Sequence, residues 1–353
     1  MLKYAINGRY LIRKQTGQER FANEIVRELD KIVKPEEFVI VVPQYAQIHA
    51  QYENIKIVKY GSVKSHLWEQ ISFLRYIVKN KLLSINLTTT CPFWSPGIVC
   101  IHDAAYFEIS NLLTTNLYGK LSTIWHRILA YGAAKRAKKI LTVSNYSKNR
   151  LAENLNIPTS RFAILRNGWQ HLNRINPDES IFSIFPPKII RHEYFMALSS
   201  LSPQKNFIWI KEIAKRNPLK QFIICGKYDG ATNVGQETLK NENIFFTGYI
   251  SDEQMKALMS NCKAFIHPAI YEGFGIPPLE ALSCGAQLIL SNTTCLPEIY
   301  ENSAHYIDPH KYDYNLDKLL QDPVESAEII LKKYNWAEEA KKLLEVIDEI
   351  EKN

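Results

Sequence analysis

Short apolar runs alternate with longer amphipathic stretches along most of the chain. In the first half, the apolar runs predict strands near 2–7, 37–43, 54–59, 84–87, 97–102, 139–143 and 162–165. Amphipathic spacing predicts helices near 17–32, 64–80, 113–137 and 146–155. Strands that alternate with helices in this way are typical of α/β domains built on parallel sheets.

A polar stretch marked by prolines, 175–188, interrupts the pattern and predicts a linker. Beyond it, strands are predicted near 193–198, 221–225, 243–246, 263–267 and 287–290, with helices near 206–216, 252–260 and 277–284. A last amphipathic helix is predicted over 336–351. We therefore predict two Rossmann-like domains, 1–178 and 179–335, and a terminal helix within 336–353.

Composition narrows the class of protein. Of 353 residues, 46% are hydrophobic and 22% are charged, as in soluble globular proteins. No apolar run approaches the roughly 18 residues of a membrane span, and the N-terminus leads directly into a predicted strand. The six cysteines form no CxxC pair, which favours free thiols in a reducing compartment. We expect a cytoplasmic protein.

The net charge of +7 is unevenly distributed. Residues 1–180 hold 25 lysines and arginines against 13 acidic residues, whereas residues 181–353 hold 18 against 23. A basic first half suggests an anionic partner for that half. Two basic amphipathic stretches, Lys64–Lys81 and Tyr118–Lys139, are either ordinary helices with a solvated edge or a surface that docks on an anionic membrane face. Nucleic acid is not expected, because no recognised binding module is present.

The richest motif of the chain runs from His267 to Ala281 and reads HPAIYEGFGIPPLEA. Glu272 and Glu280 flank a glycine-rich turn that opens a helix, which predicts free N–H groups and a positive dipole end over Gly273–Ile276. Such a helix start favours a phosphate or diphosphate. One glutamate lies on each side of the anion, so a sugar nucleotide fits the layout. The alternative is that both glutamates are merely solvated.

Glu272 to Glu280 resembles the E-x7-E motif of the retaining glycosyltransferases of family 4, the sucrose-synthase-like type. The resemblance implies the GT-B fold, an α/β fold in which two Rossmann-like domains with parallel sheets face a central cleft. It also implies that the C-terminal helix crosses back to the first domain. Glu272 would bind sugar hydroxyls, and Glu280 the ribose diol. The leaving diphosphate would lie on the backbone of Gly273, Phe274, Gly275 and Ile276.

The same resemblance assigns further contacts in the second domain. Ser199, Ser200 and Lys205 stand where the family places a basic diphosphate clamp, although the serines replace its usual charged or threonine residue. Lys205 is otherwise an ordinary lysine at a helix start. The nucleotide base would lie against the backbone near Tyr249 and Ile250.

Two positions of the first domain are also implicated by the resemblance. His102, in Ile101-His102-Asp103, would lie near the donor sugar, and Gly17 would let backbone approach the donor phosphates or the acceptor. The structural alternatives are a histidine buried at a strand end and a simple helix start with Thr16 as its N-cap.

Several other chemistries lack their motifs. The sequence contains no G-x-G-x-x-G after its first strand and no GxxxxGK[ST] loop, which argues against dehydrogenases and P-loop enzymes. It contains no D-x-D, so we expect no metal and no other cofactor, with Lys205 and the helix dipole holding the diphosphate.

Taken with the resemblance, the motifs predict a retaining glycosyltransferase. It would move a sugar from a nucleoside-diphosphate sugar to an acceptor hydroxyl, on a lipid-linked glycan of bacterial surface polysaccharide such as O-antigen or capsule. Two alternatives remain open: a nucleotide-sugar 2-epimerase of the same architecture, and a non-catalytic sugar-nucleotide-binding subunit.

Overall fold

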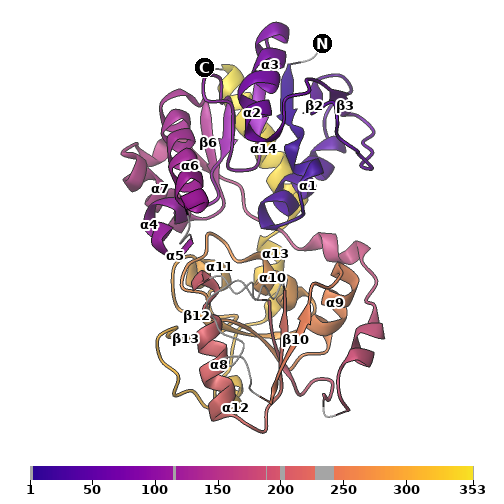
Figure 1. Ribbon diagram of the computed structural model, residues 1–353, viewed down its shortest axis with the longest axis vertical. Helices are drawn as coiled ribbons and strands as arrows, with labels where there is room; N and C mark the ends of the chain where they lie inside the picture. Colours follow the sequence, from indigo (N-terminus) through magenta and orange to yellow (C-terminus); the bar gives the residue numbers. More distant parts are fainter. Residues whose placement is uncertain (1–2, 114–116, 188, 199–202, 227–241, 353) are drawn as a thin grey trace. The chain divides into compact units, whose positions relative to one another are not determined.

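A computed structural model of the protein describes residues 3–113, 117–187, 189–198, 203–226 and 242–352 (Figure 1). The chain divides into two compact units. The first unit holds residues 1–110, 114–167 and 335–353, and the second holds 111–113 and 168–334. The second unit thus begins at Gly168, whereas the sequence predicted a boundary after residue 178. Each unit is described below by itself.

A seven-stranded parallel sheet with the order β3-β2-β1-β4-β5-β6-β7 forms the first unit. Its strands are β1 (Tyr4–Asn7), β2 (Phe38–Val42), β3 (Lys56–Lys59), β4 (Leu83–Asn86), β5 (Ile98–Cys100), β6 (Lys139–Thr142) and β7 (Phe162–Ile164). The chain leaves the centre of the sheet at β1 towards one edge and returns through β4 towards the other. The carboxyl ends of β1 and β4, where the direction changes, form the topological switch point at which open α/β sheets bind ligands.

Helices cover both faces of this sheet. They are α1 (Gly17–Asp30), α2 (Ser65–Trp68), α3 (Leu74–Asn80), α4 (Ala105–Glu108), α5 (Ser110–Leu113), α6 (Leu117–Arg136) and α7 (Asn145–Leu155). A single π-helical turn, Glu69–Phe73, joins α2 to α3, so the helix predicted over 64–80 is continuous but irregular. The helix predicted over 113–137 corresponds to α6 (Leu117–Arg136), while α4 and α5, which come before it, were not predicted.

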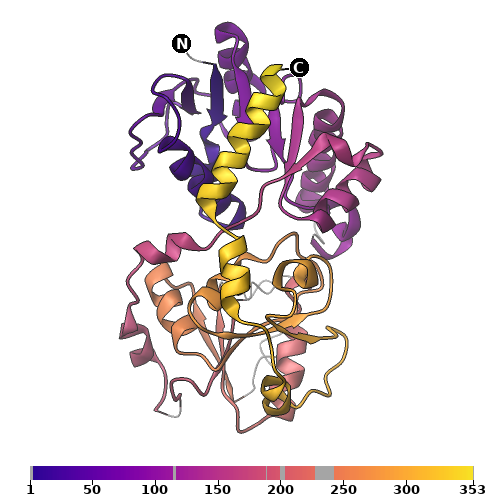
Figure 2. The same ribbon diagram turned by 180° about the vertical axis from the view of Figure 1, so that it is seen from behind.

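The C-terminal helix α14 (Trp336–Lys352) belongs to the first unit, as predicted. It lies along the sheet beside α1 (Figure 2). The Trp336 ring packs edge-on against Phe21 of α1, with 6.1 Å between ring centroids. The buried Glu339 carboxylate accepts a hydrogen bond of 2.9 Å from the backbone N–H of Arg166. The last helix therefore completes the core of the domain that the first residues began.

A six-stranded parallel sheet with the order β10-β9-β8-β11-β12-β13 forms the second unit. Its strands are β8 (Phe195–Leu198), β9 (Phe222–Cys225), β10 (Ile244–Gly248), β11 (Ala264–His267), β12 (Gln287–Ser291) and β13 (His305–Ile307). Its helices are α8 (Phe207–Arg216), α9 (Asp252–Ser260), α10 (Ile276–Ser283), α11 (Leu296–Tyr300), α12 (Leu316–Gln321) and α13 (Ala327–Lys333). The predicted linker over 175–188 contains a short 3-10 helix, Glu179–Ile184, that belongs to this unit.

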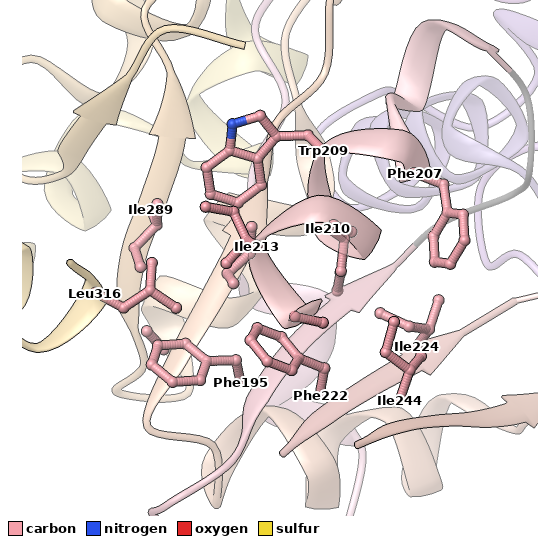
Figure 3. Packing of buried hydrophobic residues seen from close by; sticks show 14 of the residues in the cluster. Phe195, Phe207, Trp209, Ile210, Ile213, Phe222, Ile224, Ile244, Ile289 and Leu316 are labelled. Atoms are coloured by element: carbon pink, nitrogen blue, oxygen red, sulfur yellow. The ribbon is translucent and has the colours of Figure 1, made fainter. Parts of the chain in front are cut away.

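An aromatic and aliphatic core fixes α8 on the second sheet (Figure 3). Phe195 of β8 and Phe222 of β9 stack with 5.4 Å between ring centroids, and Trp209 of α8 is fully buried beside them. Trp209 also donates its indole N–H to the carbonyl of Lys311 at 2.7 Å. Because Lys205 lies two residues before the first residue of α8, this packing also fixes the position of Lys205.

All six cysteines are free thiols, as the sequence predicted. No helix of the described residues is both long enough and apolar enough to cross a bilayer.

Candidate active site

The loop between β11 and α10 carries the main motif of the sequence. Gly275 is the N-cap of α10 and has φ +86°, a left-handed backbone that favours glycine. A Cβ at this position would approach the Leu296 side chain to 2.9 Å. The buried Tyr300 hydroxyl donates a hydrogen bond to the Gly275 carbonyl and so fixes the turn from below. The turn is therefore closely packed at Gly275.

The start of α10 presents unused hydrogen-bond donors. The N–H groups of Phe274, Gly275 and Ile276 find no acceptor among the described residues. Pro277 and Pro278, which follow, have no N–H to satisfy. Unpaired N–H groups at a helix N-terminus attract anions through hydrogen bonds and the helix dipole. The loop therefore presents the donors that the sequence predicted, and anion binding to them stays a prediction.

Glu272 lies between two nitrogen-bearing side chains. Its Oε1 accepts a hydrogen bond of 2.9 Å from His267 Nε2 and forms an ion pair of 2.5 Å with Lys205 Nζ. Burial alone would raise the pKa of the Glu272 carboxyl, but the Lys205 charge and the His267 hydrogen bond outweigh it and lower the pKa to about 2. Burial also lowers the pKa of His267. Glu272 is therefore a carboxylate at neutral pH, and neutral His267 is its donor.

Lys205 ends a short 3-10 helix, Pro203–Lys205, that precedes α8. The next residue, Asn206, is buried and donates from its side chain to the carbonyls of Pro268 (3.1 Å) and Pro309 (2.9 Å). The N–H of Ile270 donates to the carbonyl of Gln204 at 2.8 Å. These bonds join the loop before α8 to the loop before α10, which holds Lys205 against Glu272. Ser199 and Ser200 lie outside the described residues.

Glu280 lies inside α10 and is only 8% exposed. Its Oε1 meets Nε2 of His171 at 2.8 Å, and His171 is itself 2% exposed. His171 stands on the 3-10 helix Gln170–Arg174 at the start of the second unit. A buried carboxylate needs such a partner, and one oxygen of Glu280 is thereby oriented.

The remaining predicted residue pair of this unit lies at the end of β10. Tyr249 follows Gly248, which has φ +70° and open space around its Cα, and the Tyr249 side chain is 65% exposed. Ile250 is half-buried and precedes α9, whose N-cap is Ser251. The backbone of both residues leaves the carboxyl end of a parallel strand, where ligands of such sheets bind.

In the first unit, His102 follows β5 and Gly17 is the first residue of α1. His102 is 7% exposed, and its Nε2 lies 2.9 Å from the carbonyl oxygen of Leu87. Burial lowers the pKa of His102 to about 4, so the ring is neutral. The N-cap residue Thr16 donates its N–H to the Glu19 carboxylate at 3.3 Å, which is half of a capping box. Gly17 is thus the first residue of a helix with Thr16 as its N-cap, as the structural alternative predicted.

Two histidines of this site were missed by reasoning from the sequence. His267 is five residues before Glu272 and ends β11, so its place at the end of the strand was the available signal. His171 is more than a hundred residues from Glu280, and no local pattern joins the two.

Among the described residues, no group of three or more His, Cys, Asp or Glu side chains is arranged to hold a metal ion.

A known protein family matches part of the chain. Residues 186–349, which include Lys205, Glu272 and Glu280, match the family "Glycosyl transferases group 1". This part of the chain is similar to a glycosyl transferase group 1 domain. This match agrees with the resemblance to glycosyltransferases that the Glu272–Glu280 motif suggested; retention of the anomeric configuration stays a prediction.

Two similar proteins of known name come from enteric bacteria. The chain is 27% identical over 262 residues to the O-antigen chain mannosyltransferase RfbU of Salmonella typhimurium, covering 71% of this chain and 69% of that protein. It is 28% identical over 196 residues to the O-antigen chain mannosyltransferase B of Escherichia coli, covering 52% of this chain and 51% of that protein. The second match therefore spans about half of each protein.

Solved structures with the same fold cover nearly the whole chain. Sucrose-phosphate synthase from Thermosynechococcus elongatus superposes with a TM-score of 0.72 at 13% identity, covering 99% of both chains. The glycosyltransferase WaaG, involved in lipopolysaccharide biosynthesis, gives 0.61 at 14% identity, covering 97% of this chain and 94% of WaaG. HepE of Anabaena, solved with UDP and glucose, gives 0.68 at 16% identity, covering 99% of this chain and all of HepE. These likenesses confirm the predicted GT-B fold.

Proposed function

We propose that the protein is a retaining glycosyltransferase that moves a sugar from a nucleoside-diphosphate sugar to an acceptor hydroxyl. The observation that carries the proposal is Glu272, a carboxylate with 15% of its side chain exposed, which Lys205 and His267 hold ionised beside the free N–H groups of the α10 start. Anion-binding donors next to a fixed negative charge suit a substrate that loses a diphosphate while its sugar becomes positive.

Each group has a role in the proposed reaction. The N–H groups of Phe274 to Ile276, together with Lys205, stabilise the departing diphosphate. Glu272 binds sugar hydroxyls and stabilises the oxocarbenium-like transition state. The acceptor oxygen attacks the face from which the diphosphate leaves, and the departing phosphate takes the acceptor proton. Anomeric configuration is therefore retained, and no metal takes part.

The other predicted residues complete the donor site in this proposal. Glu280, oriented by His171, binds the ribose diol. The backbone near Tyr249 and Ile250 lies against the base, and Ser199 and Ser200 contact the phosphates. His102 and Gly17 of the first unit contribute the contacts to the sugar and to phosphate or acceptor that the family resemblance assigns to them.

The acceptor and the pathway are also proposed, on the names of the relatives. Because two of them are named as O-antigen chain mannosyltransferases, we propose a mannosyl nucleotide as donor and a lipid-linked O-antigen or capsule glycan as acceptor. Such an acceptor would bring the protein to the inner face of the plasma membrane as a peripheral protein.

The test is a screen of UDP-, GDP- and dTDP-sugars for release of the nucleoside diphosphate, with and without chelator. We expect turnover with one donor, no effect of EDTA, and at least a hundred-fold loss in Glu272→Gln. The matched control is Glu253→Gln, an exposed glutamate on α9, which should retain wild-type turnover. Isomerisation of the free donor would instead identify an epimerase. Donor binding with no turnover would identify a non-catalytic subunit.

A further inference from the structure

Helix α6 is apolar on two opposite sides. One side packs into the core of the first unit through Leu129, Ala130, Ala133 and Ala134. The other side exposes Leu117, Leu121, Ile124, Ile128 and Tyr131, with exposed fractions of 74%, 58%, 52%, 46% and 46%. Because these five residues follow one another at spacings of four and three, they form one stripe along the helix. A helix that is apolar all round is normally covered on every side. We therefore expect another molecule to contact this exposed stripe.

Positive charge predominates along the stripe. At its Tyr131 end, the acidic residues Glu108 and Glu153 are both paired with Arg150. Residues 109–152 contain eight lysines and arginines and no aspartate or glutamate. On and beside α6, the exposed cations Lys120, Lys135 and Lys138 have no acidic partner among the described residues. A helix with apolar side chains beside uncompensated cations has the composition of one that lies on an anionic lipid surface.

A second exposed stripe lies on the segment Ser65–Asn80. Leu67, Ile71 and Val78 are 59%, 44% and 62% exposed. Exposed cations again lie beside them, namely Lys64, Arg75 and Lys79. Within residues 54–102 the one acidic residue is Glu69. It is fully buried and paired with Arg9 at 2.6 Å, so it does not offset the surface charge.

The two stripes belong to the same face of the first sheet. The Ser65–Asn80 segment connects β3 to β4, and α6 connects β5 to β6, so both connections run across the sheet in the same direction. Right-handed crossovers then place both on one face, opposite α14, as Figures 1 and 2 show from the two sides. The ring of His66 lies 6.4 Å from that of Trp125 and 6.3 Å from that of His126, which joins the segment to α6.

We propose that the exposed faces of α6 and of Ser65–Asn80 together form a docking surface for an anionic phospholipid bilayer. The apolar stripes enter the boundary between headgroups and acyl chains, and the flanking cations bind the phosphates. A second copy of the chain fits less well, since pairing two α6 stripes would bring uncompensated cations together. The inference deepens the membrane contact in the proposed function and adds the surface that makes it.

Vesicle co-sedimentation tests the surface. We expect the protein to bind vesicles made of a mixture of phosphatidylglycerol and phosphatidylcholine and to be released from them by high salt. It should not bind vesicles of pure phosphatidylcholine. Leu121→Gln/Ile128→Gln and Lys120→Glu/Lys135→Glu should each weaken binding at least ten-fold. The matched control is Ile190→Gln/Leu219→Gln, which changes two exposed apolar residues of the second unit, 60% and 92% exposed, and should bind as wild type.

Several outcomes would overturn the proposal: wild-type protein that ignores anionic vesicles, surface variants that bind as well as wild type, or a control variant that loses binding. A concentration-dependent dimer that Leu121→Gln/Ile128→Gln dissociates, with no vesicle binding, would assign the stripe to a second copy. Thermal unfolding verifies that each variant is folded. Hydrolysis of the soluble donor separates this proposal from the proposed function: docking without any donor turnover would refute only the function, and turnover without docking only the surface.

Discussion

The ionised state of Glu272 has a consequence for stability in acid that can be worked out from its surroundings. Its pKa falls from an ordinary 4.5 to about 2 in the folded chain. One pKa unit corresponds to about 1.4 kcal/mol, so the charged form contributes on the order of 3 kcal/mol to the free energy of unfolding. A lowered carboxyl pKa stabilises the protein above the unfolded value and loses that contribution as the pH falls towards the folded value. About 2 kcal/mol of it should be gone at pH 3.

The perturbation is Glu272→Gln, which removes the titrating group and keeps its shape. Between pH 7 and pH 3 the free energy of unfolding of the wild type should fall by about 2 kcal/mol more than that of the variant. The pH-independent cost of the substitution cancels in this difference. Hydrogen exchange of the peptide that contains β11, measured along a urea titration, reports the unfolding of the second unit separately from that of the first. Equal acid sensitivity of the two proteins would refute the electrostatic account of Lys205, His267 and Glu272.

Three further predictions concern the same unit. His171→Leu should raise the KM for the donor about ten-fold with little change in kcat, because Glu280 loses the partner that orients it for the proposed ribose contact. Steady-state kinetics measure both constants, and a selective loss of kcat would contradict this prediction. Gly275→Ala should lower the free energy of unfolding by about 1–3 kcal/mol, because alanine at positive φ is strained and its Cβ meets Leu296; an unchanged urea midpoint would refute it. Asn206→Ala should cost about 1–3 kcal/mol by leaving two buried carbonyls unpaired and should lower donor turnover, and urea titration with donor hydrolysis checks both.

Much of the fold could be predicted from local pattern alone. Buried parallel strands such as Phe38–Val42 are continuous apolar runs, and a Gly275-Ile276-Pro277 sequence indicates a helix start without reference to the rest of the chain. Glu272 and Glu280 could be identified for the same reason, since one loop and one helix hold both. Features that depend on such local chemistry are readable before any tertiary contact is known.

The elements and contacts that were missed depend on the tertiary structure. β13 (His305–Ile307) begins with a histidine and is followed by Asp308, so it forms no apolar run, and it is defined by its pairing with β12. The π-helical turn at Glu69 has no sequence signature, and it accompanies a buried carboxylate that receives hydrogen bonds from Asn7, Arg9 and Thr90. His171 reaches Glu280 from a segment that precedes the whole second sheet.

The position of α14 also constrains how the protein can be made. The first unit needs residues from both ends of the chain, because Trp336 and Glu339 pack on elements formed before residue 167. During synthesis, that unit stays incomplete until α14 (Trp336–Lys352) has left the ribosome, whereas the residues of the second unit are made before α14. The second unit can therefore fold first, and any premature stop that removes α14 would damage the unit whose other elements lie furthest from it in sequence.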